Sequence, residues 1–111
     1  MTALELARHY LKSFIGEYSI DEIQSVLSND LIFEGPFLRC SSASDYIKSL
    51  INDPIKDAKI MIIDEFEHEN GACIIYELVK PEVSIPVAQW FKTSNGQIVE
   101  IRVFFDSGKF K

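Results

Sequence analysis

The sequence predicts an α+β fold in which three helices precede most of a curved sheet. Three hydroxyl residues are each followed, three positions later, by an acid, and this spacing is typical of helix starts. After Pro54 the chain changes to runs of β-branched and aromatic residues separated by turn residues. Helices grouped ahead of strands are typical of an α+β fold with the helices on one side of the sheet.

Each expected helix begins at one of these capping pairs. The pairs are Thr2 with Glu5, Ser19 with Glu22, and Ser42 with Asp45. Behind each pair, apolar residues recur at helical spacing. We expect the first helix to end at Gly16 and the third at the segment 52–54, because glycine and proline commonly end helices.

One strand is expected before the third helix and four after it. The first is the segment 30–36, which a Gly35-Pro36 turn closes. The later four cover residues 59–68, 72–80, 84–93 and 97–106. Asn70-Gly71 and Asn95-Gly96 tolerate positive φ, so the last four strands are predicted to form an antiparallel meander. The element order is ααβαββββ, in one domain over residues 1–111.

Charge and composition limit the classes of partner. The 111 residues are 47% hydrophobic and 25% charged, as in a globular protein, and carry a net charge of −6. A negative surface repels phosphate backbones and anionic lipids, so we expect no nucleic-acid and no membrane partner. No run approaches the roughly 18 apolar residues that span a bilayer, and no secretion signal is recognisable, so a cytoplasmic location is expected.

Metal and cofactor sites have no signature in the sequence. Cys40 and Cys73 lie far apart and match no metal-ligand spacing and no disulfide scaffold. There is no glycine-rich phosphate loop. We therefore expect neither a metal nor a cofactor.

The last expected strand holds the strongest candidate for chemistry. Residues 97–106 alternate two faces and end on Asp106. A carboxylate beside apolar groups can have a raised pKa and transfer protons. Alternating polar residues usually mark the solvent face, so alternation alone places Arg102 in solvent and Asp106 at the end of the strand. The core face would then hold Val99, Ile101, Val103 and Phe105.

The chain resembles the nuclear transport factor 2-like superfamily, which includes the SnoaL-like polyketide cyclases, ketosteroid isomerases and limonene epoxide hydrolases. The resemblance rests on the element order, on DLIFEGP at 30–36, and on NGQIVEIRVFFD at 95–106. It implies a cone, in which a curved antiparallel sheet wraps around the helices and encloses an apolar pocket. It also implies a homodimer that pairs through the outer face of the sheet.

The resemblance assigns residues to known sites of the superfamily. Tyr10 matches the helix tyrosine of the ketosteroid isomerases, but Gly35 and Ala88 stand where those enzymes have carboxylates. Asp106 matches a late acid of the epoxide hydrolases and cyclases. The remaining catalytic groups of these enzymes have no counterpart, so the catalytic set is incomplete.

In the register that the resemblance implies, the pocket is mostly apolar with a few polar groups. The inward residues would be Glu34, Tyr76, Leu78, Lys80, Ala88, Trp90, Arg102, Phe104 and Asp106. Trp90 has an alternative interpretation as a core aromatic residue.

Two functions follow as alternatives. The favoured one is a domain that binds a small lipophilic molecule without the full catalytic set. Its ligand-binding residues would be Glu34, Tyr76, Lys80, Trp90, Arg102 and Phe104. The other is a cofactor-independent acid/base enzyme of the isomerase, cyclase or epoxide-hydrolase type. There Asp106 would transfer the proton and Tyr10 would donate a hydrogen bond, and a cation, Lys80 or Arg102, would stabilise the oxyanion.

Overall fold

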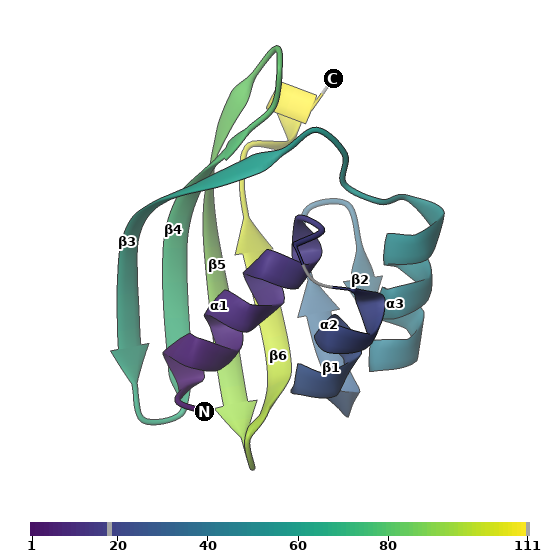
Figure 1. Cartoon of the computed structure of the whole chain (residues 1–111), viewed down its shortest axis with the longest axis vertical. Coiled ribbons are helices and arrows are strands. Elements are labelled where there is room, and N and C mark those ends of the chain that lie inside the picture. Colours follow the sequence, from purple (N-terminus) through teal and green to yellow (C-terminus); the bar gives the residue numbers. More distant parts are fainter. Residues whose placement is uncertain (18, 111) are drawn as a thin grey trace.

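The computed structural model describes residues 1–17 and 19–110, and within them three α-helices and six strands (Figure 1). The helices are α1 (Ala3–Phe14), α2 (Ile20–Val26) and α3 (Ala43–Asn52). The strands are β1 (Leu27–Glu34), β2 (Arg39–Cys40), β3 (Lys59–His68), β4 (Gly71–Val79), β5 (Ser84–Ser94) and β6 (Gln97–Phe104), followed by a short 3-10 helix, η1 (Ser107–Phe110). The predicted α+β class and element order are confirmed, and the two-residue β2 is an addition that pairs with β1.

Side-chain caps fix the starts of two helices. Thr2 and Glu5 form a complete capping box, in which each side chain accepts the other's backbone N–H, at 3.1 Å and 2.9 Å. Ser42 Oγ accepts the N–H of Asp45 at 3.1 Å. α2 begins after Ser19 as expected, but the Ser19 side chain makes no capping hydrogen bond.

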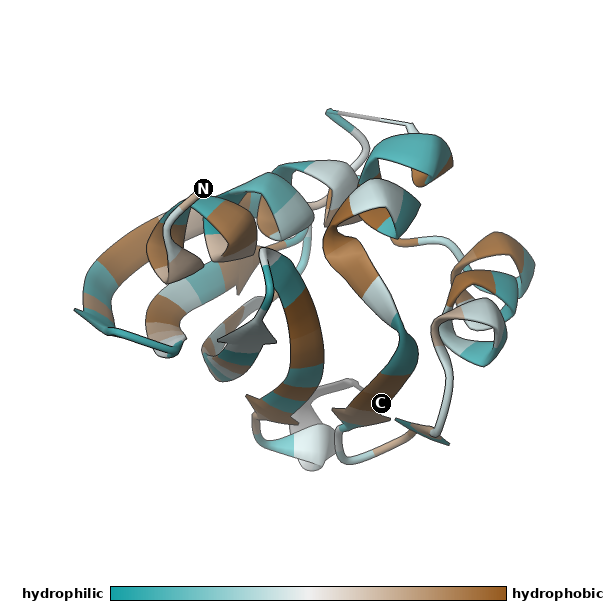
Figure 2. Cartoon of the chain, turned by 90° about the horizontal axis from the view of Figure 1, so that it is seen from below, coloured by the Kyte–Doolittle hydropathy of each residue, from teal (hydrophilic) through white to brown (hydrophobic). Residues whose placement is uncertain are grey.

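The sheet has the strand order β2-β1-β6-β5-β4-β3. β3 to β6 form the predicted antiparallel meander, whereas β1 joins it parallel to β6, so the sheet is mixed. The connection from β1 to the meander passes through α3 and fixes no strand direction, which is why the sequence did not reveal the parallel pair. The sheet curves around α1, which packs against β3, β4, β5 and β6, and the helices lie on one side of it (Figures 1 and 2).

The core lies between this concave face and the helices. Its largest fully buried side chains are Tyr10, Tyr46, Phe91, Ile23, Leu31, Ile74, Ile85, Ile98 and Ile101. Phe91 meets Tyr10 edge to face, with ring centroids 5.5 Å apart. The aromatic side of α1 therefore lies directly over the middle of the sheet.

Two acids of β3 hold the start of α1 against the sheet. Glu65 binds the guanidinium of Arg8 through two contacts of 2.8 Å. Glu67 Oε2 accepts the backbone N–H of Leu4 at 2.8 Å, which satisfies one of the donors left free at a helix start. Both acids therefore anchor α1.

The Arg8–Glu65 pair should give stability a specific pH dependence. The hydrogen bond from Arg8 holds the pKa of Glu65 below its ordinary value. A carboxyl with a depressed folded-state pKa contributes stability above its unfolded pKa, and this is lost as pH falls through the folded value. We expect Arg8→Met to remove part of the acid-induced loss below about pH 5, and to change neutral-pH stability little because the pair is partly exposed. Urea unfolding of both proteins across this pH range measures the difference, and parallel curves would contradict the assignment.

Candidate functional site

A cavity of about 770 Å³ opens between the concave face of the sheet, α1, α3 and the loop that follows α3. This volume is in the range of small-molecule sites. Most of its wall is apolar, with contributions from Phe14, Phe33, Leu50, Leu78, Val87 and Phe105. The cavity can therefore exclude water from the body of a lipophilic molecule.

Four buried polar side chains form the floor of the cavity. The hydroxyl groups of Tyr10 and Tyr46 share a hydrogen bond, and the hydroxyl of Tyr76 donates to Gln89 Oε1 at 2.9 Å. Each of the four residues is at most 2% exposed, and all four line the cavity. α1, α3, β4 and β5 each contribute one of them.

The floor tyrosines are neutral donors. Burial raises the pKa of Tyr10, and hydrogen bonds from Tyr46 and Gln89 oppose this increase only in part. Burial likewise raises the pKa of Tyr46 and of Tyr76, and the neighbouring Tyr10 adds to both increases. All three hydroxyls therefore stay protonated at neutral pH and can donate hydrogen bonds, but they cannot act as bases.

The Tyr10–Tyr46 pair carries a second hydroxyl proton besides the one the two oxygens share. Two hydroxyl groups carry two protons, and only one of these can lie between the two oxygens. The second proton needs another acceptor, and Gln89, which hydrogen-bonds both Tyr10 and Tyr76, is the polar neighbour on the floor. An acceptor oxygen that reaches the pair would compete with Gln89 for this proton, and its net gain would be that of one neutral hydrogen bond, about 0.5–1.5 kcal/mol.

Charged groups occur at the rim of the cavity. Lys56 and Asp53 are exposed on the loop after α3, and Lys80 is half-buried just beyond the end of β4. Phe37, also exposed, lies over Phe105 with ring centroids 5.6 Å apart. Among the described residues, Asp53 is the one carboxylate of the lining. Unlike the floor residues, it is exposed to solvent.

The structure brings three of the predicted site residues into the cavity. Tyr10 and Tyr76 lie on its floor and Lys80 on its rim. The other five do not line it: Glu34, Trp90, Arg102, Phe104 and Asp106. The register that the resemblance implied is therefore wrong for the ends of β1, β5 and β6.

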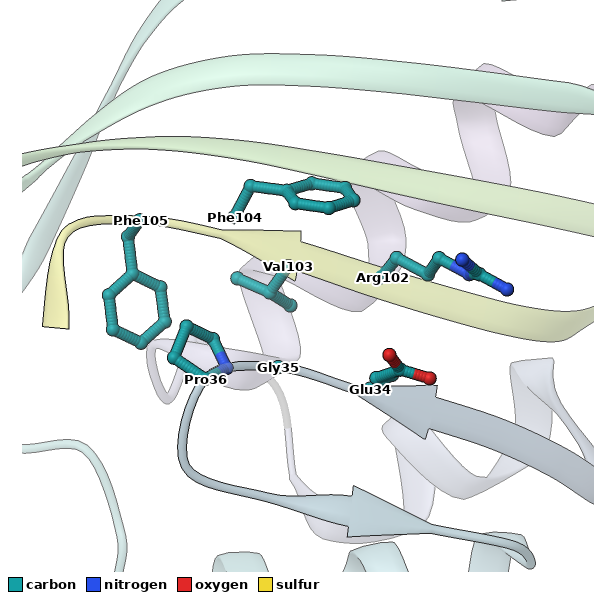
Figure 3. Close-up of a pocket in the computed structure, with 7 residues that line it drawn as sticks. All are labelled: Glu34, Gly35, Pro36, Arg102, Val103, Phe104 and Phe105. Atoms are coloured by element: carbon teal, nitrogen blue, oxygen red, sulfur yellow. The ribbon is translucent and has the colours of Figure 1, made fainter.

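The physical reason is strand alternation with one bulge. Val99 is an extra residue in β6, because Thr93 pairs with Ile98 while Lys92 pairs with Glu100. Beyond the bulge, Ile101 is buried and the alternation predicted from the sequence holds. Figure 3 shows Phe104 on the opposite side of β6 from Val103 and Phe105.

Four of these five residues, all except Asp106, share the outer face of the sheet. Trp90 pairs with Arg102 across β5 and β6, and Arg102 pairs with Glu34 on β1. The Arg102 guanidinium lies 6.0 Å from the Trp90 ring centre and 2.8 Å from Glu100. Trp90 is thus neither a pocket wall nor a core residue. A shallow depression of about 300 Å³ lies where β1 and β6 separate, and its border includes Glu34, Arg102 and Phe104 (Figure 3).

Asp106 follows β6 and is exposed. Its Oδ1 accepts the backbone N–H of Gly108 at 3.0 Å, a local turn contact at the start of η1. The structure does not bring it together with Tyr10, since it is absent from the described lining of the cavity.

Sequence reasoning missed two residues of the floor. Tyr46 follows the helical periodicity of α3, a pattern that ordinary core residues share. Gln89 is next to Ala88, and the comparison with ketosteroid isomerases selected Ala88, whose side chain lies on the outer face with Phe104. A signal was present, because a glutamine between buried apolar residues of a central strand needs polar partners inside the core.

Metal ligation has no support in the part of the chain that the structure describes. No three His, Cys, Asp or Glu side chains come together in residues 1–17 and 19–110. Cys40 is buried and Cys73 partly buried, and both are free thiols. No helix in these residues has the length and apolar character needed to cross a bilayer.

Solved structures with the same architecture identify the fold. An NTF2-like protein of unknown function from Cytophaga hutchinsonii superposes with a TM-score of 0.84 at 20% identity, covering 99% of this chain and 95% of that one. The chain has the NTF2-like (nuclear transport factor 2-like) fold. No protein-family model and no curated protein sequence matches it.

Two further NTF2-like neighbours belong to different functional groups. A candidate polyketide cyclase from Pseudomonas putida KT2440 has a TM-score of 0.78 at 14% identity, covering 99% of this chain and 96% of its own. An LEH-like epoxide hydrolase from M. tuberculosis has a TM-score of 0.77 at 18% identity, covering 96% and 84%. At these identities the likeness concerns the NTF2-like fold, and function must be argued from the cavity.

Proposed function

We propose that this NTF2-like chain binds a small lipophilic molecule that carries an acceptor oxygen, such as a ketone, ester or lactone. The observation that carries the proposal is the apolar cavity of about 770 Å³ that ends on the Tyr10–Tyr46 pair. The walls would hold the apolar body of the ligand, and the second hydroxyl proton of the pair would be donated to its oxygen. Donors in an otherwise apolar pocket select ligands by the oxygen they present.

The neighbouring folds support a small-molecule role. A candidate polyketide cyclase and an epoxide hydrolase have similar structures, and the names of both describe proteins that act on small organic molecules. In this chain the floor offers neutral donors and no base, which favours binding over proton transfer.

The acid/base alternative depends on Asp106. That carboxylate is exposed and outside the cavity lining, so a ligand held on the floor would not meet it. Asp106→Asn is accordingly expected to leave ligand binding unchanged.

We also propose that the chain forms a homodimer through the outer face of the sheet. Ile75, Ala88 and Phe104 form one continuous cross-strand row on this face, and Phe104 is exposed. Exposed apolar rows of this kind commonly mark contact surfaces.

A matched pair of probes tests the ligand proposal. 2-Tetralone and tetralin have the same fused-ring body and differ by one carbonyl oxygen. Isothermal titration is expected to show wild-type protein binding the ketone about three- to tenfold more tightly, the ratio that one neutral hydrogen bond supplies. Tyr46→Phe should remove most of this preference and leave tetralin binding intact. Failure of both probes to bind at millimolar concentration would overturn the proposal.

A further inference from the structure

β3 is an edge of the sheet with an unusual distribution of apolar side chains. It is ten residues long, closes the strand order, and within the described chain pairs with β4 alone. Met61, Ile62 and Ile63 are 62%, 47% and 58% exposed. Exposed apolar edge strands are templates for pairing with another chain, and soluble proteins usually protect them.

Protection is present in one half of β3 only. From Asp64 onward the strand carries acids, a register shift lies at Ile63, and Glu65 and Glu67 bind the start of α1. In the half from Lys59 to Ile63 the single charged residue is Lys59. Figure 1 shows β3 on the outside of the sheet and bent partway along its length. The first half therefore presents both its backbone edge and its apolar side chains.

We propose that a second copy of this chain pairs antiparallel with the first half of β3, so that the two sheets become continuous. The contact is separate from the cavity and from the outer face of the sheet, and it does not depend on the proposed function.

The charge order along the strand selects the partner and its direction. Lys56 and Lys59, with Asp57 between them, precede the apolar segment, so residues 56–59 keep one net positive charge (two lysines less one aspartate), and the acids Asp64, Glu67 and Glu69 follow it. Antiparallel pairing of two copies brings the lysine end of each beside the acidic end of the other. Parallel pairing would instead place like charges opposite one another. The segment is thus complementary to itself in one direction only.

The register follows from centring the apolar residues 60–62 on the two-fold axis. Residues directly opposite in an antiparallel pair lie on the same face, and before the bulge Ile60 and Ile62 share the face of Tyr76 and Leu78. A two-fold axis at Met61 places Ile60 opposite Ile62 of the second copy and Met61 opposite its own counterpart. The paired segment would contain apolar contacts on both faces.

Native mass tests the contact. We expect light scattering at about 100 µM to give a multiple of the 12.7 kDa chain and Ile62→Asp to lower that mass, since a charge in the pairing segment blocks edge association. Ile51→Asp is the matched control, because Ile51 is similarly exposed but lies on α3. It should leave the mass unchanged. A wild-type mass of one chain, or equal masses for wild type and Ile62→Asp, would overturn the proposal.

Cross-linking tests the same contact without weakening it. In a Cys73→Ser background, Met61→Cys should form an intermolecular disulfide on mild oxidation, since opposite residues have Cα atoms within disulfide reach. Lys59→Cys should not, because its counterpart would lie four positions away, about 14 Å. Phe104→Asp, which disrupts the outer face, should leave the Met61→Cys cross-link in place. Equal cross-linking of the two cysteine variants, or none from Met61→Cys, would contradict the register and the pairing.

Discussion

Phe91→Ala is expected to destabilise the protein by about 3–5 kcal/mol, the usual cost of removing a buried aromatic ring. Phe91 lies on β5 with no exposed surface and packs edge to face against Tyr10 of α1. Its loss would leave a void at the contact between the sheet and the central helix, where rigid elements on both sides limit relaxation. A loss of this size is a large fraction of the total free energy of unfolding of a small domain, so the variant should be largely unfolded at moderate temperature.

Lys92→Ala is the control for this prediction. Lys92 is the next residue of β5 and is exposed, so its replacement should change stability by no more than about 0.5 kcal/mol. Urea unfolding monitored by circular dichroism measures both variants. Similar losses for the two, or a loss below about 1 kcal/mol for Phe91→Ala, would show that the register of β5 is not the one described.

Val87→Trp is expected to abolish binding of 2-tetralone, with affinity falling more than about tenfold. Val87 is buried and lines the cavity, and a tryptophan side chain there would occupy the space proposed for the ligand body. The free volume of about 770 Å³ can accept the larger ring, so the fold should persist with a cost of no more than about 1–3 kcal/mol.

Ala88→Trp provides the matched comparison. Ala88 adjoins Val87 on β5 but lies on the outer face, opposite Phe104 of β6. The same enlargement there should leave 2-tetralone affinity within about twofold of wild type. Retained binding in Val87→Trp, with loss in Ala88→Trp, would move the ligand site to the outer face.

Local signals in the sequence were sufficient for most of the fold. The capping pairs at Thr2 and Ser42 form as hydrogen bonds, and Asn95-Gly96 turns between β5 and β6 with both residues at positive φ. The parallel pairing of β1 with β6 was not predictable in this way, because it joins segments about 70 residues apart and depends on how the sheet closes around α1.

The candidate site was only partly predictable. Alternation placed Ile101 and Phe105 correctly, whereas the resemblance turned Arg102 and Phe104 inward. The bulge at Val99 lets Ile98 and Ile101 both face the core. No residue type in that segment predicts a bulge.

The floor of the cavity shows a second limit. Tyr10 could be predicted from the resemblance, but its partners Tyr46 and Gln89 come from α3 and β5, where each follows a periodicity that ordinary core residues share. Only the assembled fold brings Tyr46 and Gln89 to the same place as Tyr10 and Tyr76. The members of a polar cluster built from several elements have no characteristic spacing in the sequence, so sequence reasoning finds them one at a time or not at all.

The central claim is that the cavity between the sheet, α1 and α3 holds a lipophilic ligand with its oxygen on the tyrosine pair. The most direct test is a two-dimensional NMR titration of the wild-type protein with 2-tetralone. The account predicts saturable shifts concentrated on cavity residues such as Leu50, Leu78 and Phe105, with the outer face unchanged. Shifts confined to the outer face around Trp90 and Phe104, or no saturable shifts at all, would contradict it.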